Sequence, residues 1–308
     1  MVQGFLLILP IMCCIWTGWL LKRIGIFNDE GGAQMGRVVF YLAAPCIVFR
    51  FVYALKPADF ADVNFSIVLN GGYVVIILIS CVMQLFRRCS VQRKAASVMM
   101  SIRSNNMFMG MPAVIMMWGE KILPVFGRYM ALAEVGFEFL SALSGLIVLN
   151  GGLNRKSLSR VGGSLIRNPV IISIMLGLLF GMGLHVKLPQ WLSLSIDILG
   201  DLGTGLALLT LGMKLKPAEL FSDLAVVWPE VIMRLFLAPL ILWAGFRLLP
   251  VEPSMEKIGV LVMGMPVAMN TYPMAAAMGM DDDYTARSIM VSTILSVFSL
   301  PVIIRFLL

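Results

Sequence analysis

The chain has 308 residues, of which 59% are hydrophobic and only 13% are charged, and its mean hydropathy is +0.92. Soluble domains carry about 25% charged residues, so this composition excludes an ordinary soluble domain and predicts that the bilayer is the solvent for most of the chain. The net charge of +7 does not indicate nucleic-acid binding, because the basic residues lie in short clusters between apolar runs, as in the loops of membrane proteins.

Ten apolar segments follow one another along the chain, each near the roughly 20 residues that a spanning helix needs. The first lacks the basic region and cleavage site of a signal peptide, so we expect it to be a retained helix. The loops are short, and the best linker candidate is 151–156 at the middle of the chain. The sequence therefore predicts an all-α integral membrane protein with ten transmembrane helices, at about residues 4–21, 36–54, 65–86, 95–118, 126–149, 166–184, 194–213, 224–247, 257–280 and 284–306.

The two halves of the chain resemble each other. Pro10 and Gly18 in segment one have the same spacing as Pro169 and Gly177 in segment six, and Gly-Met-Pro occurs in both segment four and segment nine. Together and in order, these matches predict two five-helix repeats, residues 1–150 and 151–308. Because five is odd, the second repeat must enter the membrane inverted.

The loop charges predict the orientation. Lys and Arg concentrate in cytoplasmic loops, and the densest clusters here are 87–88, 93–94 and 155–156. With ten spans, these clusters fall on the cytoplasmic side when both termini lie on the opposite side. We therefore expect both termini to be non-cytoplasmic.

Two of the apolar segments contain helix breakers in matching places. Segment four carries 103–112, which reads Arg-Ser-Asn-Asn-Met-Phe-Met-Gly-Met-Pro, and segment nine carries 264–273. Proline removes a backbone donor and breaks or kinks a helix, and in hydrocarbon such a break is tolerated only where protein or a water-filled cavity satisfies the freed groups. Matched breaks in two halves predict a transporter's binding site near the membrane midplane. The alternative is that both prolines only kink their helices for packing.

The breaks also supply groups that can bind an anion. Pro112 and Pro273 suit the first turn of new half-helices, whose N-terminal ends carry partial positive charge and free N–H groups. The amides beside them can hold a carboxylate, a water or a cation. The candidate substrate-binding residues are Asn105, Asn106, Gly110, Pro112, Pro266, Asn270 and Thr271.

Ionisable residues inside spans are costly and are functional candidates by default. Glu134 and Glu138 are four residues apart in segment five, so they share a helix face near midplane depth. They are candidates for binding a coupling proton or cation, and the alternative is a structural role as partners for Arg103 or another helix. Glu230 and Arg234, four apart in segment eight, are expected to pair within their helix.

Several stretches resemble the auxin efflux carrier family of permeases. Residues 104–112 match its Ser-Asn-x-x-x-x-Gly-x-Pro signature, and Met265-Pro266 with Asn270 resembles its ninth helix. Leu9-Pro10 with Gly18, 40–45 and 206–215 resemble its first, second and seventh helices. The resemblance spans nearly the whole chain, and the absence of the long central loop of some plant members indicates the compact bacterial type.

This resemblance implies two inverted five-helix repeats in which helices four and nine cross at the midplane. It implies a scaffold of helices one, two, six and seven, which often forms a homodimer in such folds, and a mobile transport domain of helices three to five and eight to ten. It further implies an elevator-type mechanism, carboxylate substrates such as malate, malonate or auxin, and a location in the plasma membrane, here a bacterial inner membrane.

The sequence thus predicts a secondary active transporter for a small organic anion, driven by a proton or sodium gradient or by none. The alternative is a membrane receptor or sensor that binds a similar carboxylate without moving it. An enzyme is not expected, because no nucleophile–base–orienter set and no P-loop is present. No metal or other cofactor is expected either, since His185 is the single histidine and the five cysteines form no Cys-x-x-Cys pair.

Overall fold

The computed structural model describes residues 2–60, 63–152, 159, 162–163, 166–215 and 220–307. Its described residues form helices and no β-strand, apart from one isolated bridge between Ser104 and Val267. In chain order the elements are α1 (Val2–Arg23), α2 (Asp29–Val38), η1 (Val39–Ala43), α3 (Ala44–Tyr53), η2 (Pro57–Phe60), α4 (Val63–Leu85), α5 (Val91–Met100), η3 (Asn106–Gly110), α6 (Met111–Trp118), η4 (Glu120–Ile122), α7 (Leu123–Asn150), α9 (Pro169–Leu178), η5 (Leu179–Gly183), α10 (Gln190–Lys214), α11 (Leu220–Ile232), η7 (Met233–Leu237), α12 (Ala238–Phe246), α13 (Pro253–Met263), α14 (Thr271–Met278) and α15 (Asp282–Phe306).

The apolar segments of the sequence correspond to these helices, and several are long enough to cross a bilayer. Six stretches in the described part of the chain have the length and hydropathy of a membrane span: Asp29–Tyr53, Val63–Leu85, Glu120–Asn150, Gln190–Lys214, Asp223–Phe246 and Asp282–Phe306. The predicted all-helical, multi-pass membrane protein is confirmed. The number ten and the inverted repeat stay predictions, because segments one and six are not among these six stretches and segments four and nine are divided into shorter helices.

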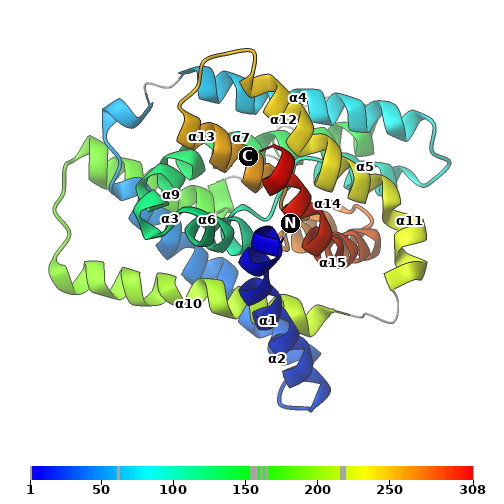
Figure 1. The fold of residues 1–308 in the computed structure, drawn as a ribbon, viewed down its shortest axis with the longest axis horizontal. Helices are drawn as coiled ribbons and strands as arrows, with labels where there is room; N and C mark the ends of the chain where they lie inside the picture. Colours follow the sequence, from blue (N-terminus) through cyan, green and yellow to red (C-terminus); the bar gives the residue numbers. More distant parts are fainter. Residues whose placement is uncertain are drawn as a thin grey trace.

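One group of helices is assembled through small residues. α1 lies against α10, and α3 lies against both α9 and α10 (Figure 1). A side chain at Gly18 of α1 would come within 2.0 Å of the carbonyl oxygen of Leu209, and one at Gly212 of α10 within 1.9 Å of the carbonyl oxygen of Ile15. Glycine at both positions lets the two backbones touch, which is how helices pack where lipid provides no hydrophobic drive.

A second group surrounds the broken segments. α5 packs on α7, α4 on α12, α12 on α13, and α11 on α15. Aromatic rings join three of these helices, since Phe65 of α4 lies 5.7 Å from the ring of Phe246 and 6.0 Å from that of Tyr129. Of the broken helices, α5 packs against α7, α13 against α12, and α14 against α15.

The predicted boundary between the halves falls where α7 ends. Gly151 follows Asn150 with φ of +70°, a left-handed conformation that glycine adopts at little cost and that closes a helix. The rest of the linker candidate, 153–156, lies outside the described residues. The division at residues 150 and 151 into two repeats stays a prediction.

Candidate functional site

The two breaks meet and form hydrogen bonds with each other. α5 ends at Met100 and α13 ends at Met263. Beyond these ends the chains run antiparallel, and the N–H of Asn105 donates to the carbonyl of Pro266 while the N–H of Ala268 donates to the carbonyl of Arg103, both at 2.9 Å. Each break thus satisfies backbone groups that the other has freed, as irregular backbone inside a membrane protein requires. We call this arrangement the crossover.

The helical path resumes differently on the two sides of the crossover. In the second segment, α14 begins at Thr271 and Pro273 lies in its first turn, as predicted. In the first segment, the path resumes at Asn106, before Pro112, because a π-turn closed by the N–H of Gly110 and the carbonyl of Asn105 precedes α6. Pro112 lies in the first turn of α6, which begins at Met111, as predicted, but the helix end that faces the crossover is that of η3.

A small cavity of about 30 Å³ lies beside the crossover. It has room for about one or two waters. Four of the predicted site residues line it, together with residues from α3, α7 and α9. The lining residues are Phe40, Ala44, Ser104, Asn105, Asn106, Met107, Phe108, Glu134, Phe137, Val170, Ala268, Met269 and Asn270.

Several polar groups of this cavity have no partner. The side-chain nitrogen of Asn105, a residue only 2% exposed, and the side-chain oxygen of Asn270 make no hydrogen bond to any described residue. The backbone N–H groups of Met107 and Phe108 lie in the first turn of η3, where N–H groups have no acceptor within the helix. Buried polar groups are nearly always hydrogen-bonded, so these groups indicate a place where a ligand can bind.

The other four predicted binding residues support the crossover and do not line the cavity. Gly110 allows η3 to approach α13, since a side chain there would lie 3.3 Å from the Cγ1 of Val262. Pro112 is buried within α6, and Pro266 contributes the carbonyl that accepts from Asn105. The hydroxyl of Thr271 accepts a hydrogen bond from the Nε of Arg103 at 3.0 Å.

The two glutamates of α7 have different surroundings. Glu138, 2% exposed, accepts from both terminal nitrogens of Arg103, at 2.9 Å and 3.0 Å, and from the side-chain nitrogen of Asn270 at 3.5 Å. This geometry matches the alternative that the sequence left open for Glu138, a structural role as the partner of Arg103. Ser141 completes the coordination of this guanidinium at 2.9 Å.

Glu134 has no such cation. It is 5% exposed, lines the cavity, and accepts a hydrogen bond at 3.3 Å from the side-chain nitrogen of Asn106. No ion pair among the described residues includes it. The sequence placed both glutamates on the same helix face but could not show which one faces the cavity.

The expected pair between Glu230 and Arg234 is wrong. Glu230 accepts from Arg87 at 3.0 Å and, over shorter distances, from the hydroxyls of Ser97 and Tyr284. Arg234 instead donates to backbone carbonyls near the breaks. Spacing within one helix predicted the pair, but other helices supply acceptors and donors that match each group better.

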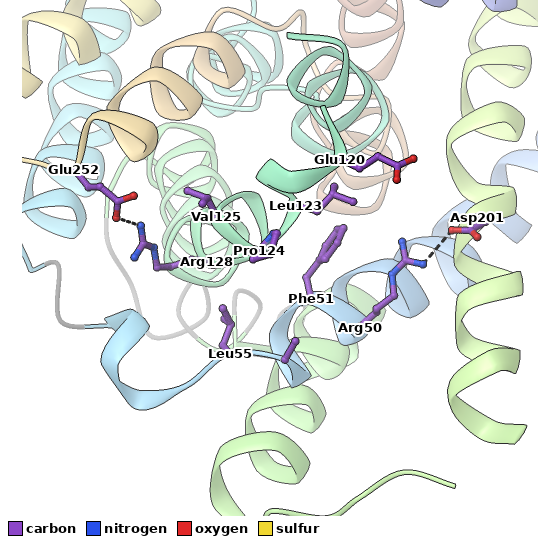
Figure 2. A pocket seen from close by; sticks show the side chains of 11 residues that line it. Arg50, Phe51, Leu55, Glu120, Leu123, Pro124, Val125, Arg128, Asp201 and Glu252 are labelled. Atoms are coloured by element: carbon purple, nitrogen blue, oxygen red, sulfur yellow. Dashed lines mark hydrogen bonds and ion pairs between the residues drawn. The ribbon is translucent and has the colours of Figure 1, made fainter. Parts of the chain in front are cut away.

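Two larger hollows are present in the described part of the chain. The Arg128 vestibule, of about 560 Å³, is lined by Arg50, Phe51, Ala54, Leu55, Glu120, Leu123, Pro124, Val125, Arg128, Asp201 and Glu252. Figure 2 shows Arg128 turned toward Glu252 and Arg50 turned toward Asp201, on opposite sides of this hollow.

The Lys214 vestibule, of about 540 Å³, is lined by Lys22, Asp29, Ala33, Leu211, Lys214, Leu215, Asp223, Met269, Tyr272, Asp283, Ala286, Arg287, Ile289 and Met290. It shares Met269 with the crossover cavity. Asp201 of one vestibule and Lys214 of the other belong to the same helix, α10, and a rise of about 1.5 Å per residue separates them by roughly 20 Å. The two vestibules are therefore well separated along α10, and the Lys214 vestibule adjoins the cavity at Met269.

A multi-pass helical membrane protein in which two discontinuous helices meet at a cavity has the architecture of a membrane transporter. Comparison with known proteins agrees: the family model described as "Membrane transport protein" matches residues 4–150 and 153–304. The chain belongs to this family, the auxin efflux carrier family that its motifs resemble.

Similar proteins carry transporter and signalling names. An uncharacterized transporter of Methanocaldococcus jannaschii is 23% identical over 300 residues, which is 94% of each chain. A Rhizobium meliloti protein named "Putative malonate transporter" is 23% identical over 296 residues, 94% of this chain and 92% of that one. The lysosomal cholesterol signaling protein of Mus musculus is 22% identical over 306 residues, which is 92% of this chain but 35% of the mouse protein.

Proposed function

We propose that this protein is a secondary active transporter that moves a small organic carboxylate, such as malate, malonate or an auxin-like acid, across the membrane. The observation that carries the proposal is the crossover cavity with its unpartnered hydrogen-bonding groups. The amide of Asn105 and the N–H groups of Met107 and Phe108 are donors. They stand at the N-terminal end of a half-helix, where the helix dipole favours negative charge.

The chemistry of these donors fits a carboxylate. A carboxylate oxygen accepts hydrogen bonds from neutral amides, and such bonds to a charged group are stronger than those between neutral partners. Arg103 is already paired with Glu138, so recognition falls to amides and to the helix end. The malonate-named relative supports this substrate class.

The walls of the cavity support an alternating-access mechanism. Phe40, Ala44 and Val170 come from the group formed by α1, α3, α9 and α10 with α2 and η1, while the crossover residues come from the other group. A cavity of about 30 Å³ is too small for a dicarboxylate, so substrate enters only when the two groups move apart. We assign the first group to the scaffold and the second to the mobile transport domain of an elevator-type transporter. The scaffold is also the surface through which we expect a homodimer to form.

For energy coupling we favour Glu134 over Glu138. Glu138 is held by Arg103, whereas Glu134 lines the cavity and is bonded to Asn106, beside the unpartnered Asn105. A carboxyl group without a cation can bind a proton together with the substrate and release it on the other side. Sodium held by the crossover amides is the alternative driving ion.

Uptake by purified protein in proteoliposomes tests the function. We expect counterflow of labelled malonate or malate. We expect Asn105→Ala to weaken binding about ten- to a hundredfold, because a hydrogen bond from its amide to a charged group contributes roughly 1.5–3 kcal/mol. Asn270→Ala should weaken binding as well, because the free side-chain oxygen of Asn270 can hold a driving cation. Asn64→Ala is the control, since Asn64 bonds the carbonyl of Pro250 at an exposed position. Wild-type affinity in both crossover variants would mean that the helix breaks serve packing and do not form the substrate site.

A receptor or sensor is the second candidate function, and the name of the mouse relative favours it. Its site would be the same crossover cavity. The two functions separate in the same experiment, because a sensor binds the carboxylate without counterflow. Binding lost in Asn105→Ala, with no counterflow by the wild-type protein, would identify the sensor.

A further inference from the structure

Arg234 is a buried cation that is not paired with an acid in the described part of the chain. It lies in η7, and its side chain is almost completely buried, at 1% exposed. The nearest acid along its helix, Glu230, is bonded to Arg87, Ser97 and Tyr284 instead. A buried charge is costly unless its surroundings compensate it and satisfy its donors.

Backbone carbonyls of both broken helices provide this compensation. The Nε of Arg234 donates to the carbonyl of Met265 at 3.1 Å, one terminal nitrogen donates to the carbonyl of Ser101 at 3.0 Å, and the other donates to that of Met263 over a shorter distance. Ser101 follows the last residue of α5, and Met263 is the last residue of α13. The C-terminal end of a helix carries partial negative charge and carbonyls without intrahelical partners.

We propose that Arg234 is the positioning residue of the crossover, because its guanidinium ties together the C-terminal ends of the two half-helices that lead into it. This inference rests on the proposed function in so far as the crossover is the substrate site. Met265 lies next to Pro266, whose carbonyl accepts from Asn105, so the contacts of Arg234 fix the backbone that presents the Asn105 amide. A planar fork with five donors can reach three carbonyls at once, which a lysine ammonium on a flexible stem cannot do in the same geometry.

The charge of Arg234 has a second effect on the site. Two negative helix ends point into the crossover from α5 and α13, and they oppose the binding of an anion. Arg103 is neutralised by Glu138, so it does not offset them. Arg234 lies against these ends and offsets them, which leaves the N-terminal ends of η3 and α14 to favour a carboxylate.

Hydrogen exchange and malonate binding by the full-length protein in detergent test the proposal. In Arg234→Gln we expect exchange at least about tenfold faster in 101–108 and 263–270 than in the wild type, with malonate affinity reduced about tenfold or more. Arg234→Lys keeps the charge but loses the fork, so it should restore part of the affinity and leave exchange faster in at least one of the two segments. The control is Arg247→Gln, because Arg247 ends the same helical segment with an exposed side chain; it should match the wild type.

Wild-type exchange in both segments of Arg234→Gln would overturn the proposal. So would an equal acceleration in every helix, which would mean only a general loss of stability. If Arg234→Gln fails to fold, the exchange measured in Arg234→Lys tests the proposal instead. Wild-type exchange in both 101–108 and 263–270 of that variant would also overturn it. A wild-type protein that does not bind malonate would count against the proposed function, yet it would leave the exchange result valid.

Discussion

Arg103 and Glu138 join the first break to α7 through a bidentate ion pair in which both side chains are almost completely buried, at 1% and 2% exposed. The same guanidinium also holds the hydroxyl of Thr271 at the start of α14. The pair therefore connects both broken helices to the long helix behind them. We expect the pair to orient the crossover together with Arg234.

Removing one member of this pair should destabilise the protein. In Glu138→Gln or Arg103→Gln the remaining group loses its counter-charge, and we expect a loss of about 3–5 kcal/mol. The double change Arg103→Met with Glu138→Leu should cost less than the sum of the single changes, because it leaves no unpaired charge. Thermal unfolding of the purified variants measures this, and additive losses would mean that the two groups do not interact.

Glu134→Gln should uncouple transport from the proton gradient. The amide keeps the shape of the side chain and can still accept from Asn106, so we expect malonate binding and exchange to persist while accumulation driven by a pH gradient is lost. Glu138→Gln, where it folds, is the comparison, since its carboxylate is paired with Arg103. Accumulation with unchanged pH dependence in Glu134→Gln would exclude a coupling role for this residue.

Two glycines of α10 should respond in opposite ways to alanine. At Gly212 the new methyl group would collide with the carbonyl of Ile15, whereas at Gly205 it meets no atom within 4 Å. We expect Gly212→Ala to separate α1 from α10 and to lower the midpoint of thermal unfolding by several degrees. Gly205→Ala should leave the midpoint unchanged or raise it, since alanine favours the helix by about 1 kcal/mol over glycine. Equal midpoints for the two variants would show that α1 and α10 are not in close contact.

Linking the two helix groups should block transport. The ammonium of Lys214 on α10 lies 5.5 Å from the ring centre of Tyr272 on α14, so this contact joins the proposed scaffold to the proposed transport domain. In a variant without the five native cysteines, a cross-link between Lys214→Cys and Tyr272→Cys should stop uptake until a reductant is added.

A cross-link within one group provides the control for this experiment. Arg50 and Asp201, bonded at 3.0 Å, lie on α3 and α10. A link between Arg50→Cys and Asp201→Cys should leave uptake intact. Full transport with the Lys214–Tyr272 link in place would rule out relative motion of these two helices.

The termini should both lie on the non-cytoplasmic side. This orientation follows from the clusters of Lys and Arg and from an even number of spans. A reporter fused after Leu308 that is active only in the cytoplasm should give no signal. A strong signal would require an odd number of spans or the opposite orientation.

Much of the fold could be read from the sequence, because apolar runs and helix breakers are local properties. The runs located the helices, and Pro112 and Pro266 marked the two breaks that meet in the structure. The asparagines at the cavity were found in the same way. The family followed from motifs in several helices.

The partners of buried charges could not be read in this way. The sequence placed Arg234 four residues after Glu230, but its acceptors are carbonyls contributed by α5 and α13 and the residues that follow them. It could not separate Glu134 from Glu138, because one helix face contains both and only the neighbouring helices distinguish them. The start of η3 at Asn106 was missed because a π-turn has no clear sequence signal.

The hydrogen bonds from Asn105 to Pro266 and from Ala268 to Arg103 also have a consequence for whether the two halves of the chain can be encoded separately. Each bond joins a residue before position 150 to one after it, so each half supplies a hydrogen-bond partner for the interrupted helix of the other. A gene split between the halves would encode two fragments, each of which would have to find the other before these backbone groups were hydrogen-bonded. Carrying both halves on a single polypeptide removes that search and keeps their amounts equal.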